Sequence, residues 1–369
     1  MAKLKLLFYV EHFRAATGGL ESAAVQLCRA LAHRGYDVHI LADDGDDLDD
    51  VTVHTDGLDN RVTLEGRLLP DLCIDWGFFH PAHLHRLGGG THRGFIDYNL
   101  DAYSGIPLLF RRMRYRSVKH RSIIAREQAI LRNPRAQFLA NSKLTAGLAV
   151  ADGANPERVT VHHNGVNLKH YNPERIAEYR GSVRRDWGLA DDDIAFLFIA
   201  HNLRLKNLDL MLQVFSKLDP ALKAKLVVIG KRDPGKTASW LVYAGATAAM
   251  DQFYAAGDAL VHPTYFDSCA NVILEAMACG LPVVVSDTCG VNELIADGEN
   301  GRVLAVRENA AAAWSAEVAA LAADDDLRRA RGAAARALAA ENGFDAYMDW
   351  FDQYLQDVYA TKEREAGGG

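Results

Sequence analysis

The chain has 369 residues, too many for one ordinary hydrophobic core and suited to two domains. An apolar fraction of 49% and a charged fraction of 24% are typical of a soluble globular protein, and a net charge of −7 argues against nucleic-acid binding. The odd number of scattered cysteines, with no CxxC pair, predicts free thiols in a reducing cytoplasm and neither a disulfide framework nor a zinc site.

The first part of the chain predicts a parallel α/β domain. Residues 5–10 form an apolar, β-branched run that is too short for a signal peptide and predicts a strand. The double glycine Gly18-Gly19 follows, then a helix at 20–34 and a strand at 37–42. This order of strand, glycine turn, helix and strand is typical of a doubly wound domain. Further strands are predicted at 71–75, 95–103, 137–141 and 159–163, and one long helix at 109–132.

Three histidines lie in the segment GFFHPAHLHRLGGG after the strand at 71–75. His80, His83 and His85 do not have the spacing of a helical or finger-type metal site, and no nearby Cys or Glu completes a ligand set. We therefore expect a mobile loop at the edge of a cleft here.

A second strand and helix series follows a polar stretch at 167–193, which we expect to be less ordered and to contain the linker. Strands are predicted at 194–200, 226–229, 241–243, 259–262 and 283–286, and helices at 208–217, 248–256, near 268–278, 310–341 and 344–364. Two doubly wound domains in tandem suggest a ligand in the cleft between them, facing the carboxyl ends of the strands. No segment approaches the ~18 apolar residues that span a bilayer.

Several loops at strand ends could meet an anion. Gly18 and Gly19 either let the backbone approach a ligand or form a plain tight turn. Arg204 and Lys206 follow a buried strand, so they are either solvated or placed to neutralise phosphate, and we favour phosphate.

Asp267 and Glu275 lie eight residues apart in YFDSCANVILEAMACGLP. Ser268 or Asn271 could cap the helix that begins between the two acids. Glu275 could be a favourable acid early in the helix, but its apolar neighbours leave little room for a solvated face. This carboxylate therefore needs partners, which could be neighbouring donors or the hydroxyls of a ligand.

The stretch HPTYFDSCANVILEAMACGLPVVVSDTCGVNELIADGENG resembles the donor-binding signature of the retaining glycosyltransferases of family 4, which have the GT-B fold. That signature is an acid, seven residues and then Glu, followed by Gly-x-Pro-Val-Val and a later G-x-x-E-x-I. GGLE, FLANS, RVTVHHNGVN, RLK and VVIGK extend the similarity over most of the chain. Within the family, the chain is most similar to the glucosyltransferases that add the first outer-core sugar of lipopolysaccharide.

The resemblance implies an α/β, GT-B architecture with two Rossmann-like doubly wound domains facing across a cleft. Residues 1–168 would form the acceptor-side domain, 169–345 the nucleotide-sugar domain, and 346–369 a helix and tail that cross back to the N-terminal domain. It implies neither a metal nor another cofactor, because the nucleotide sugar is a substrate.

Residue by residue, the resemblance places Glu275 on the ribose hydroxyls and Asp267 near the donor sugar. Arg204 and Lys206 would meet the diphosphate and stabilise the charge that develops on it in a front-face displacement. Asp97 and Asp101, with Asn99, are candidates for the acceptor side and complete the expected catalytic set. The remaining expected donor-binding residues are Gly18, Gly19, His201, Asn202, Gly230, Lys231, Ser268, Cys269, Ala270, Asn271 and Val272.

Three departures from the family pattern bear on sugar identity. Asp267 stands where Glu is usual, which shortens the reach to the sugar. Asn207 stands where Gly usually follows the Lys. Ser22 and Ala23 stand where the lipopolysaccharide enzymes have an acid.

The expected activity is retaining transfer of a hexose, glucose from UDP-glucose, to a hydroxyl of a glycan or glycolipid such as the lipopolysaccharide core. One alternative is a nucleotide-sugar epimerase of the same fold, which would need no acceptor. Another is an inactive scaffold that binds nucleotide or membrane.

The segment RRMRYRSVKHRSIIAR at 111–126 is basic in an otherwise acidic chain. It is either a solvated helix face or a surface that docks on anionic lipid or a phosphorylated acceptor. The resemblance favours docking and predicts a peripheral location at the inner face of the cytoplasmic membrane. The cations concerned are Arg111, Arg112, Arg114, Arg116, Lys119 and Arg121.

Overall fold

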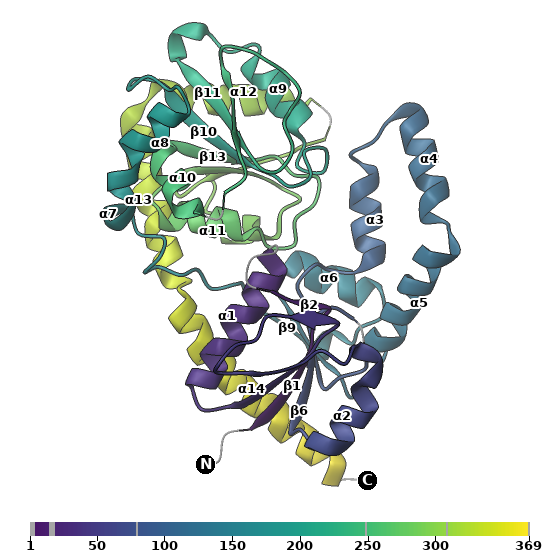
Figure 1. Ribbon diagram of the computed structural model, residues 1–369. Helices are drawn as coiled ribbons and strands as arrows, with labels where there is room; N and C mark the ends of the chain where they lie inside the picture. The colour runs from purple at the N-terminus through teal and green to yellow at the C-terminus, as the bar shows by residue number, and fades with distance from the viewer. Residues whose placement is uncertain (1–3, 15–18, 79, 248, 308, 368–369) are drawn as a thin grey trace. The chain divides into compact units, whose positions relative to one another are not determined.

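The computed structural model describes residues 4–14, 19–78, 80–247, 249–307 and 309–367 (Figure 1). Its internal contacts divide the chain into two compact units. The first contains Met1–Ile96, Phe110–His163 and Asp345–Gly369, and the second contains Asp97–Leu109 and Asn164–Phe344. Each unit is built on a parallel sheet with helices, so the expected α/β class is confirmed.

The sheet of the first unit has its earliest strand in the middle, as in doubly wound folds. The strand order is β5 (Thr52–His54), β3 (Asp37–Leu41), β1 (Lys5–Tyr9), β6 (Leu72–Asp75), β7 (Leu84–Leu87), β8 (Gln137–Ala140) and β9 (Val159–Val161), with parallel pairing throughout. A separate short pair joins β2 (His12–Phe13) and β4 (Asp44–Gly45).

The helices of the first unit include the last helix of the chain. They are α1 (Gly19–His33), α2 (Arg61–Leu68), α5 (Val118–Leu131), α6 (Lys143–Ala151) and α14 (Phe344–Gly367), while α3 (His92–Leu100) and α4 (Gly105–Tyr115) each pass from one unit into the other. Short 3-10 turns occur at Leu58–Asn60 and Pro156–Arg158. The return of α14 to the first unit, where Trp350 stacks on His162 with ring centroids 3.8 Å apart, agrees with the expected crossover helix.

The sheet of the second unit has the order β12 (Leu241–Gly245), β11 (Ala224–Ile229), β10 (Ile194–Ile199), β13 (Ala259–His262), β14 (Val283–Ser286) and β15 (Arg302–Leu304). Counted from β10, this is the Rossmann order 3-2-1-4-5-6. The chain therefore reverses its direction of winding between β10 and β13. In such sheets the loops that leave these two strands form the ligand crevice.

Helices cover both faces of this second sheet (Figure 1). Ala195 and Leu197 of β10 pack on one face, and Phe196 and Phe198 pack on the other. Because both faces are buried, the strand is a continuous apolar run without alternation. The helices are α7 (Pro173–Ile176), α8 (Arg180–Asp186), α9 (Leu208–Phe215), α10 (Met250–Ala256), α11 (Asn271–Ala278), α12 (Ala310–Ala323) and α13 (Asp325–Glu341), with 3-10 turns at Ala177–Tyr179, Pro220–Leu222 and Gly290–Leu294.

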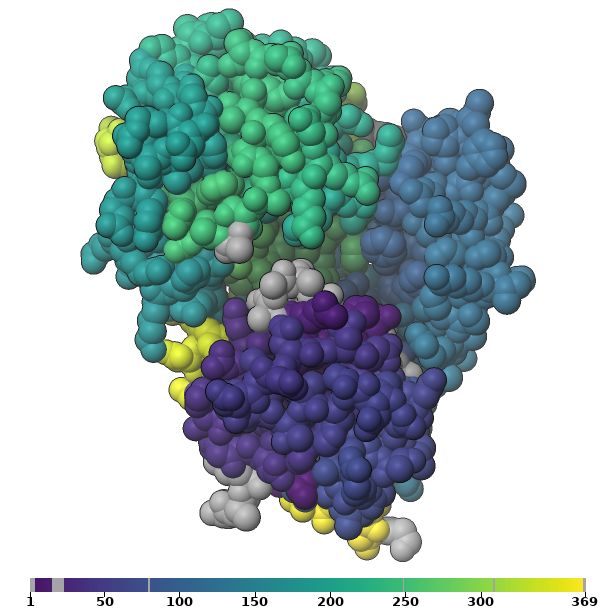
Figure 2. All heavy atoms as spheres, in the orientation of Figure 1, coloured from purple at the N-terminus to yellow at the C-terminus, as the bar shows by residue number. Residues whose placement is uncertain are grey.

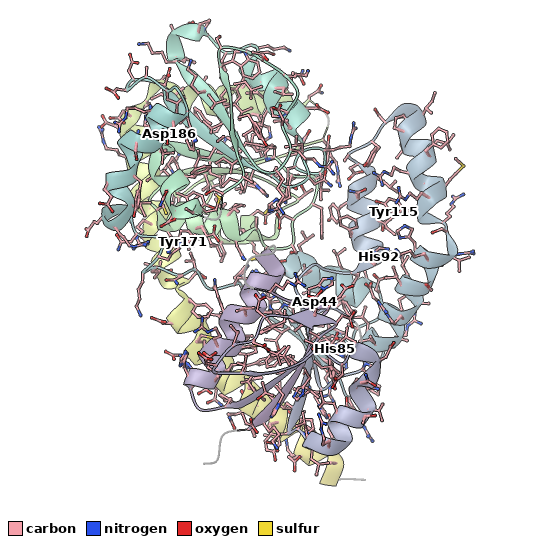
Figure 3. The ribbon with its side chains drawn as sticks, viewed as in Figure 1. Asp44, His85, His92, Tyr115, Tyr171 and Asp186 are labelled. Carbon is pink, nitrogen blue, oxygen red and sulfur yellow. The ribbon has the colours of Figure 1, made fainter. Side chains whose placement is uncertain are left out.

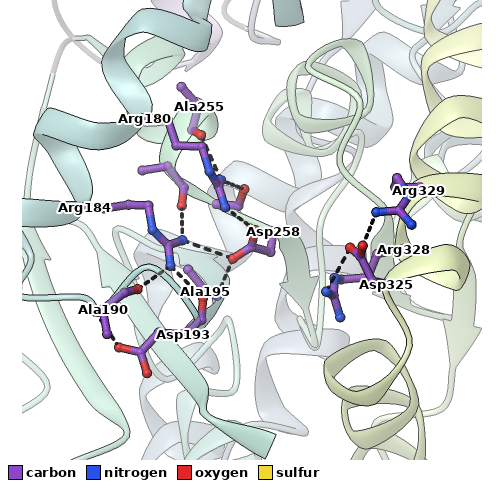
Figure 4. Close-up of polar contacts among 12 residues, drawn as sticks. Arg180, Arg184, Ala190, Asp193, Ala195, Ala255, Asp258, Asp325, Arg328 and Arg329 are labelled. Atoms are coloured by element: carbon purple, nitrogen blue, oxygen red, sulfur yellow. Dashed lines mark hydrogen bonds and ion pairs between the residues drawn. The ribbon is translucent and has the colours of Figure 1, made fainter.

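A buried arginine ties α8 to the segments that precede β10 and β13 (Figure 4). Arg184 is 4% exposed and donates to the carbonyls of Ala190, Asp193 and Ala256 and to Asp258 Oδ2. Because its donors are matched by fixed acceptors, the buried charge is compensated.

The predicted strand at 95–103 is wrong, because this segment forms α3. Thr91, which precedes the helix, accepts a hydrogen bond of 3.1 Å from the backbone of Gly94, the pattern of a capping side chain. The predicted loop at 77–90 is also wrong in part, since β7 lies inside it. His85 on β7, which is labelled in Figure 3, is 1% exposed. It hydrogen-bonds Asp75 at 3.1 Å.

Two predicted long helices are each interrupted. The helix at 109–132 is divided into α4 and α5 at Ser117, whose backbone is extended, with φ −63° and ψ 159°. The helix at 310–341 is divided at Asp324, whose side chain accepts from the backbone of Leu327 and so begins a new helix. The stretch at 167–193 also contains helical turns that were not predicted.

Within the described residues, no helix combines the length and the apolar character needed to cross a bilayer.

Candidate active site

The two loops that leave β10 and β13 are joined by hydrogen bonds. The carbonyl of Leu205 in the first loop accepts from the backbone of Tyr265 at 2.9 Å and from Thr264 Oγ1 at 3.2 Å. These bonds place Lys206 of the first loop beside Asp267 of the second. Two residues 61 positions apart thus meet where the strand order reverses.

Lys206, Asp267 and His262 form one polar cluster. Lys206 Nζ and His262 Nε2 both contact Asp267 Oδ2, the histidine at 3.2 Å. Burial by itself would raise the pKa of Asp267, but the adjacent Lys206 cation and the His262 hydrogen bond hold it well below its usual range. The Asp267 carboxylate is therefore charged throughout the physiological range.

Glu275 lies in the second turn of α11, and two tyrosines supply the partners that its apolar surroundings require. Tyr254 Oη donates to Glu275 Oε2 at 2.8 Å, and Tyr171 also hydrogen-bonds this carboxylate. Burial raises the pKa of Glu275 above its ordinary value, although both tyrosine hydrogen bonds act in the opposite direction. The partners that Glu275 needs are therefore supplied by neighbouring donors within the protein.

The amino end of α11 differs from the prediction in how it is capped. Ala270 occupies the capping position, so neither Ser268 nor Asn271 caps the helix. Asn271 is the first helical residue, and its side-chain oxygen accepts from Asn164 Nδ2 at 2.7 Å. The Ala270 side chain cannot accept a hydrogen bond from the first amides of α11, and backbone amides at the amino end of a helix can hydrogen-bond an anion. Cys269 and Ala270 are buried, whereas Ser268, Asn271 and Val272 are partly exposed.

The structure places Arg204 away from the Lys206 cluster. Its guanidinium lies over the ring of Tyr103, 5.1 Å from the centroid, and donates to the carbonyl of Ala102 at 3.4 Å. His201 and Asn202 are exposed in the same loop. Lys206 and Arg204 therefore do not converge in this structure.

Asn207 ends this loop with φ 59° and ψ 47°, a left-handed conformation. Glycine adopts this region freely and asparagine tolerates it better than other residues do. Asn207 in place of the family's usual glycine therefore preserves the backbone conformation of this loop.

Gly230 follows β11 and has a backbone conformation that requires glycine. A Cβ atom there would lie 2.0 Å from the carbonyl oxygen of Ala200, and φ is 157°. The backbones that follow β10 and β11 are therefore in close contact. The adjacent Lys231 is exposed.

Asp97 and Asp101 line an open cavity of about 430 Å³ together with Tyr98 and Arg307. Arg307 donates from both Nε and Nη2 to Asp101 Oδ2, at 3.1 and 2.6 Å. The ring of Tyr98 packs against Phe266, with centroids 5.2 Å apart. Tyr98 of the cavity thus contacts the residue that precedes Asp267 of the Lys206 cluster.

The basic segment lies on α4 and α5, whose atoms are blue in Figure 2. α4 has no buried residue. Phe110, Met113 and Val118 are 63%, 52% and 73% exposed. Around them Arg112, Arg114, Arg116, Lys119 and Arg121 are exposed, and Arg111 is partly so. Large apolar side chains among cations distinguish this surface from an ordinary solvated helix face.

Two further predictions concern the glycine turn and metals. Gly19 is the first residue of α1, and Gly18 lies outside the described residues. In the described ranges, His, Cys, Asp and Glu do not gather into a group of three or more that could hold a metal ion. Independence from metal remains a prediction.

The comparisons with known proteins agree with this geometry. Residues 193–324 match the family described as Glycosyl transferases group 1, and this range contains Lys206, Asp267 and Glu275. A D-inositol 3-phosphate glycosyltransferase of Actinosynnema mirum is 26% identical, with 93% of this chain and 95% of that protein covered. Its counterpart in Thermobifida fusca is 32% identical over 40% of this chain and 38% of its own length. The protein is a glycosyltransferase.

Solved structures of glycosyltransferases share the whole fold, which is GT-B. WaaG, a glycosyltransferase involved in lipopolysaccharide biosynthesis, has a TM-score of 0.75 at 18% identity, with 95% of this chain and 99% of that chain covered. Anabaena HepE, solved with UDP and glucose, has a TM-score of 0.71 at 16% identity, with 97% of this chain and 99% of that chain covered. At these identities the likeness establishes the fold of the glycosyltransferase.

Three residues of this site were not among the predicted site residues. His262 lies within the HPTY segment of the family signature, so its position was visible in the sequence but its contacts were not. Tyr254 and Tyr171 reach Glu275 from α10 and from the segment before α7. No sequence signal pairs them with Glu275.

Proposed function

We propose that this glycosyltransferase moves glucose from UDP-glucose to a hydroxyl of a glycan or glycolipid with retention of configuration, as a family 4 enzyme. The observation that carries the proposal is the meeting of Lys206 and Asp267 where the strand order reverses. A cation suits the diphosphate, and a charged acid suits the hydroxyls of the sugar. Anabaena HepE, which shares the fold, has been solved with UDP and glucose and with UDP-glucose, which supports the choice of donor.

In the proposed donor complex, Lys206 Nζ neutralises the diphosphate and Asp267 accepts from a sugar hydroxyl. Glu275, oriented by Tyr254, accepts from the ribose hydroxyls. The backbone amides at the amino end of α11 hydrogen-bond phosphate oxygens.

The transfer itself exchanges one bond at the anomeric carbon. The acceptor oxygen bonds to this carbon on the face from which the phosphate oxygen leaves. The acceptor's proton passes to the departing phosphate. Lys206 stabilises the negative charge that develops on that phosphate. Both substrates supply all the atoms of the step.

A thermal-shift panel of nucleotide sugars tests the donor. A ligand at a hundredfold excess over its dissociation constant stabilises the native state by about 2.7 kcal/mol, so the true donor should raise the melting temperature most. We expect UDP-glucose to give the largest shift. Failure of every UDP-sugar to move the transition would contradict the proposal.

Product analysis separates the alternatives. Conversion of a nucleotide sugar without acceptor would indicate an epimerase, and binding without transfer or hydrolysis of any donor would indicate an inactive scaffold. For the acceptor, we propose the lipopolysaccharide core. D-inositol 3-phosphate, which appears in the names of the similar glycosyltransferases, is the competing acceptor to be assayed.

We also propose that α4 and α5 dock on the anionic inner face of the cytoplasmic membrane. Each cation near such a surface contributes roughly 1 kcal/mol, and the exposed Phe110 and Met113 can enter the headgroup region. Changing four cations to Glu should abolish sedimentation with anionic liposomes: Arg111, Arg112, Arg114 and Arg116. A control with the same charge change uses exposed Arg135, Arg185, Lys217 and Lys236. Equal binding by the two variants would contradict docking by this surface.

A further inference from the structure

His262 ends β13 and is 2% exposed, with its ring against the two charged residues of the site. Its Nε2 lies 3.2 Å from Asp267 Oδ2 and 3.5 Å from Lys206 Nζ. Neither the resemblance nor the proposed mechanism gives this histidine a role.

The proton on the ring can be placed from these contacts. Nε2 can donate to a carboxylate or accept from an ammonium group, but it cannot do both. The carboxylate is the nearer partner, and Lys206 already donates to the same oxygen. His262 is therefore a neutral ring that carries its proton on Nε2 and donates to Asp267. Burial and the Lys206 cation both lower the pKa of His262, which agrees with a neutral ring.

Hydrogen bonds hold the backbone around this cluster. The carbonyl of Asp267 accepts from Gly290 at 2.8 Å, and the backbone N–H of Asp267 donates to Thr288 at 3.3 Å. The Lys206 loop is fastened through Leu205 to the segment that precedes Asp267. Lys206 has a long flexible side chain, whereas the His262 ring is enclosed at the end of a central strand.

We propose that His262 is a positioning residue of the donor site. Its Nε2–H holds Asp267 Oδ2 in place when Lys206 leaves this carboxylate for the diphosphate of a nucleotide sugar. Lys206 thus exchanges one counter-ion for another, and Asp267 remains oriented toward the sugar hydroxyls. This inference rests on the proposed function.

Two variants separate a positioning role from a merely structural one. His262→Leu removes the donor and keeps an apolar side chain in the buried space, whereas His262→Gln places an amide donor at about the reach of Nε2. Affinities for UDP and UDP-glucose are measured by calorimetry on both variants and on the wild type. The affinity for UDP measures the contacts of Lys206 with phosphate. The difference between the affinities for UDP-glucose and UDP measures the contacts of Asp267 with the sugar.

We expect His262→Leu to lower affinity for UDP-glucose about tenfold and to leave affinity for UDP within about twofold, since one hydrogen bond to a charged group is lost. His262→Gln should restore most of the loss. Equal losses for the two ligands, or no rescue by Gln, would overturn the role. A wild type that binds neither ligand would contradict the proposed function instead.

Nitrogen-15 spectra of the wild-type imidazoles provide a test that does not depend on a stable leucine variant. We expect the His262 signals, assigned by their loss in His262→Gln, to show the proton on Nε2 both before and after UDP is added. A change of tautomer on adding UDP, or a proton on Nδ1 in the free enzyme, would overturn the proposal.

Discussion

The hydroxyl of Tyr254 donates a hydrogen bond of 2.8 Å to Glu275 Oε2, and this bond orients the carboxylate that we assign to the ribose. Tyr254 is 1% exposed, so its ring cannot turn away without disrupting the surrounding core. Because of this hydrogen bond, the pKa of Glu275 depends on a residue of α10.

Tyr254→Phe should therefore change the pH dependence of UDP binding. Burial raises the pKa of Glu275, and the Tyr254 hydrogen bond opposes that rise, so its removal raises the pKa further. Because we propose that the charged form holds the ribose, affinity should rise with pH through this pKa, and the midpoint should move upward in the variant. Calorimetric titrations over a pH series measure it. Glu275→Gln is the control, which should show weak binding without this pH step.

Glu275→Ala should weaken binding of UDP more than Asp267→Ala does. Loss of Glu275 removes the proposed ribose contact, whereas loss of Asp267 releases Lys206 from its counter-ion and leaves it available to phosphate. A hydrogen bond to a charged group contributes ~1.5–3 kcal/mol, so the first variant should lose about tenfold or more in affinity. For UDP-glucose, both variants should lose affinity. A greater loss of UDP affinity in Asp267→Ala would reverse the assignment of the two acids.

Asn207→Ala should destabilise the second unit, while Asn207→Gly should not. A residue with a Cβ other than Asn or Asp loses about 1 kcal/mol in the left-handed region, which Asn207 occupies with φ 59°. Urea unfolding followed by tryptophan fluorescence compares the two variants. Equal stability of the alanine and glycine variants would show that the loop adopts another backbone conformation in solution.

Arg184→Met should destabilise the protein far more than Arg329→Met. Arg184 is buried and compensates Asp258, so its removal leaves a carboxylate and several carbonyls without that donor, at a cost of about 3–5 kcal/mol. Arg329 pairs with Asp325 (Figure 4) and with Asp326 on the surface, where solvent screens such ion pairs and makes them weak. Melting temperatures of the two variants test the difference, and comparable losses would contradict the structural role of Arg184.

Much of the second unit was predictable from local pattern. Its strands are continuous apolar runs, because both faces of a parallel sheet are covered, and each run ends at a polar loop. The need of Glu275 for partners also followed from its neighbours, Ile273, Leu274 and Met277, which are buried. Asn207 stood where glycine is usual, and its left-handed backbone shows why that position favours glycine and asparagine over most other residues.

The N-terminal part of the chain was harder to predict, because local pattern was ambiguous there. The segment FIDYNLDAY alternates in polarity like a strand, yet Thr91 begins a helix through it. His85 stands among polar and glycine residues, yet it lies in a central strand, where Asp75 satisfies it. In both segments a contact with a residue outside the pattern determined the structure.

The sequence by itself determined the fold class, the presence of two parallel sheets and the residues that end the strands of the second, since burial and turn residues repeat locally along the chain. Only the tertiary structure decided which of those residues meet. Lys206, His262 and Asp267 converge because β10 and β13 are neighbours in the sheet, and Tyr254 reaches Glu275 because α10 and α11 pack on the same face. Which residues meet depends on strand order and helix packing, and local periodicity in the sequence does not predict either of these.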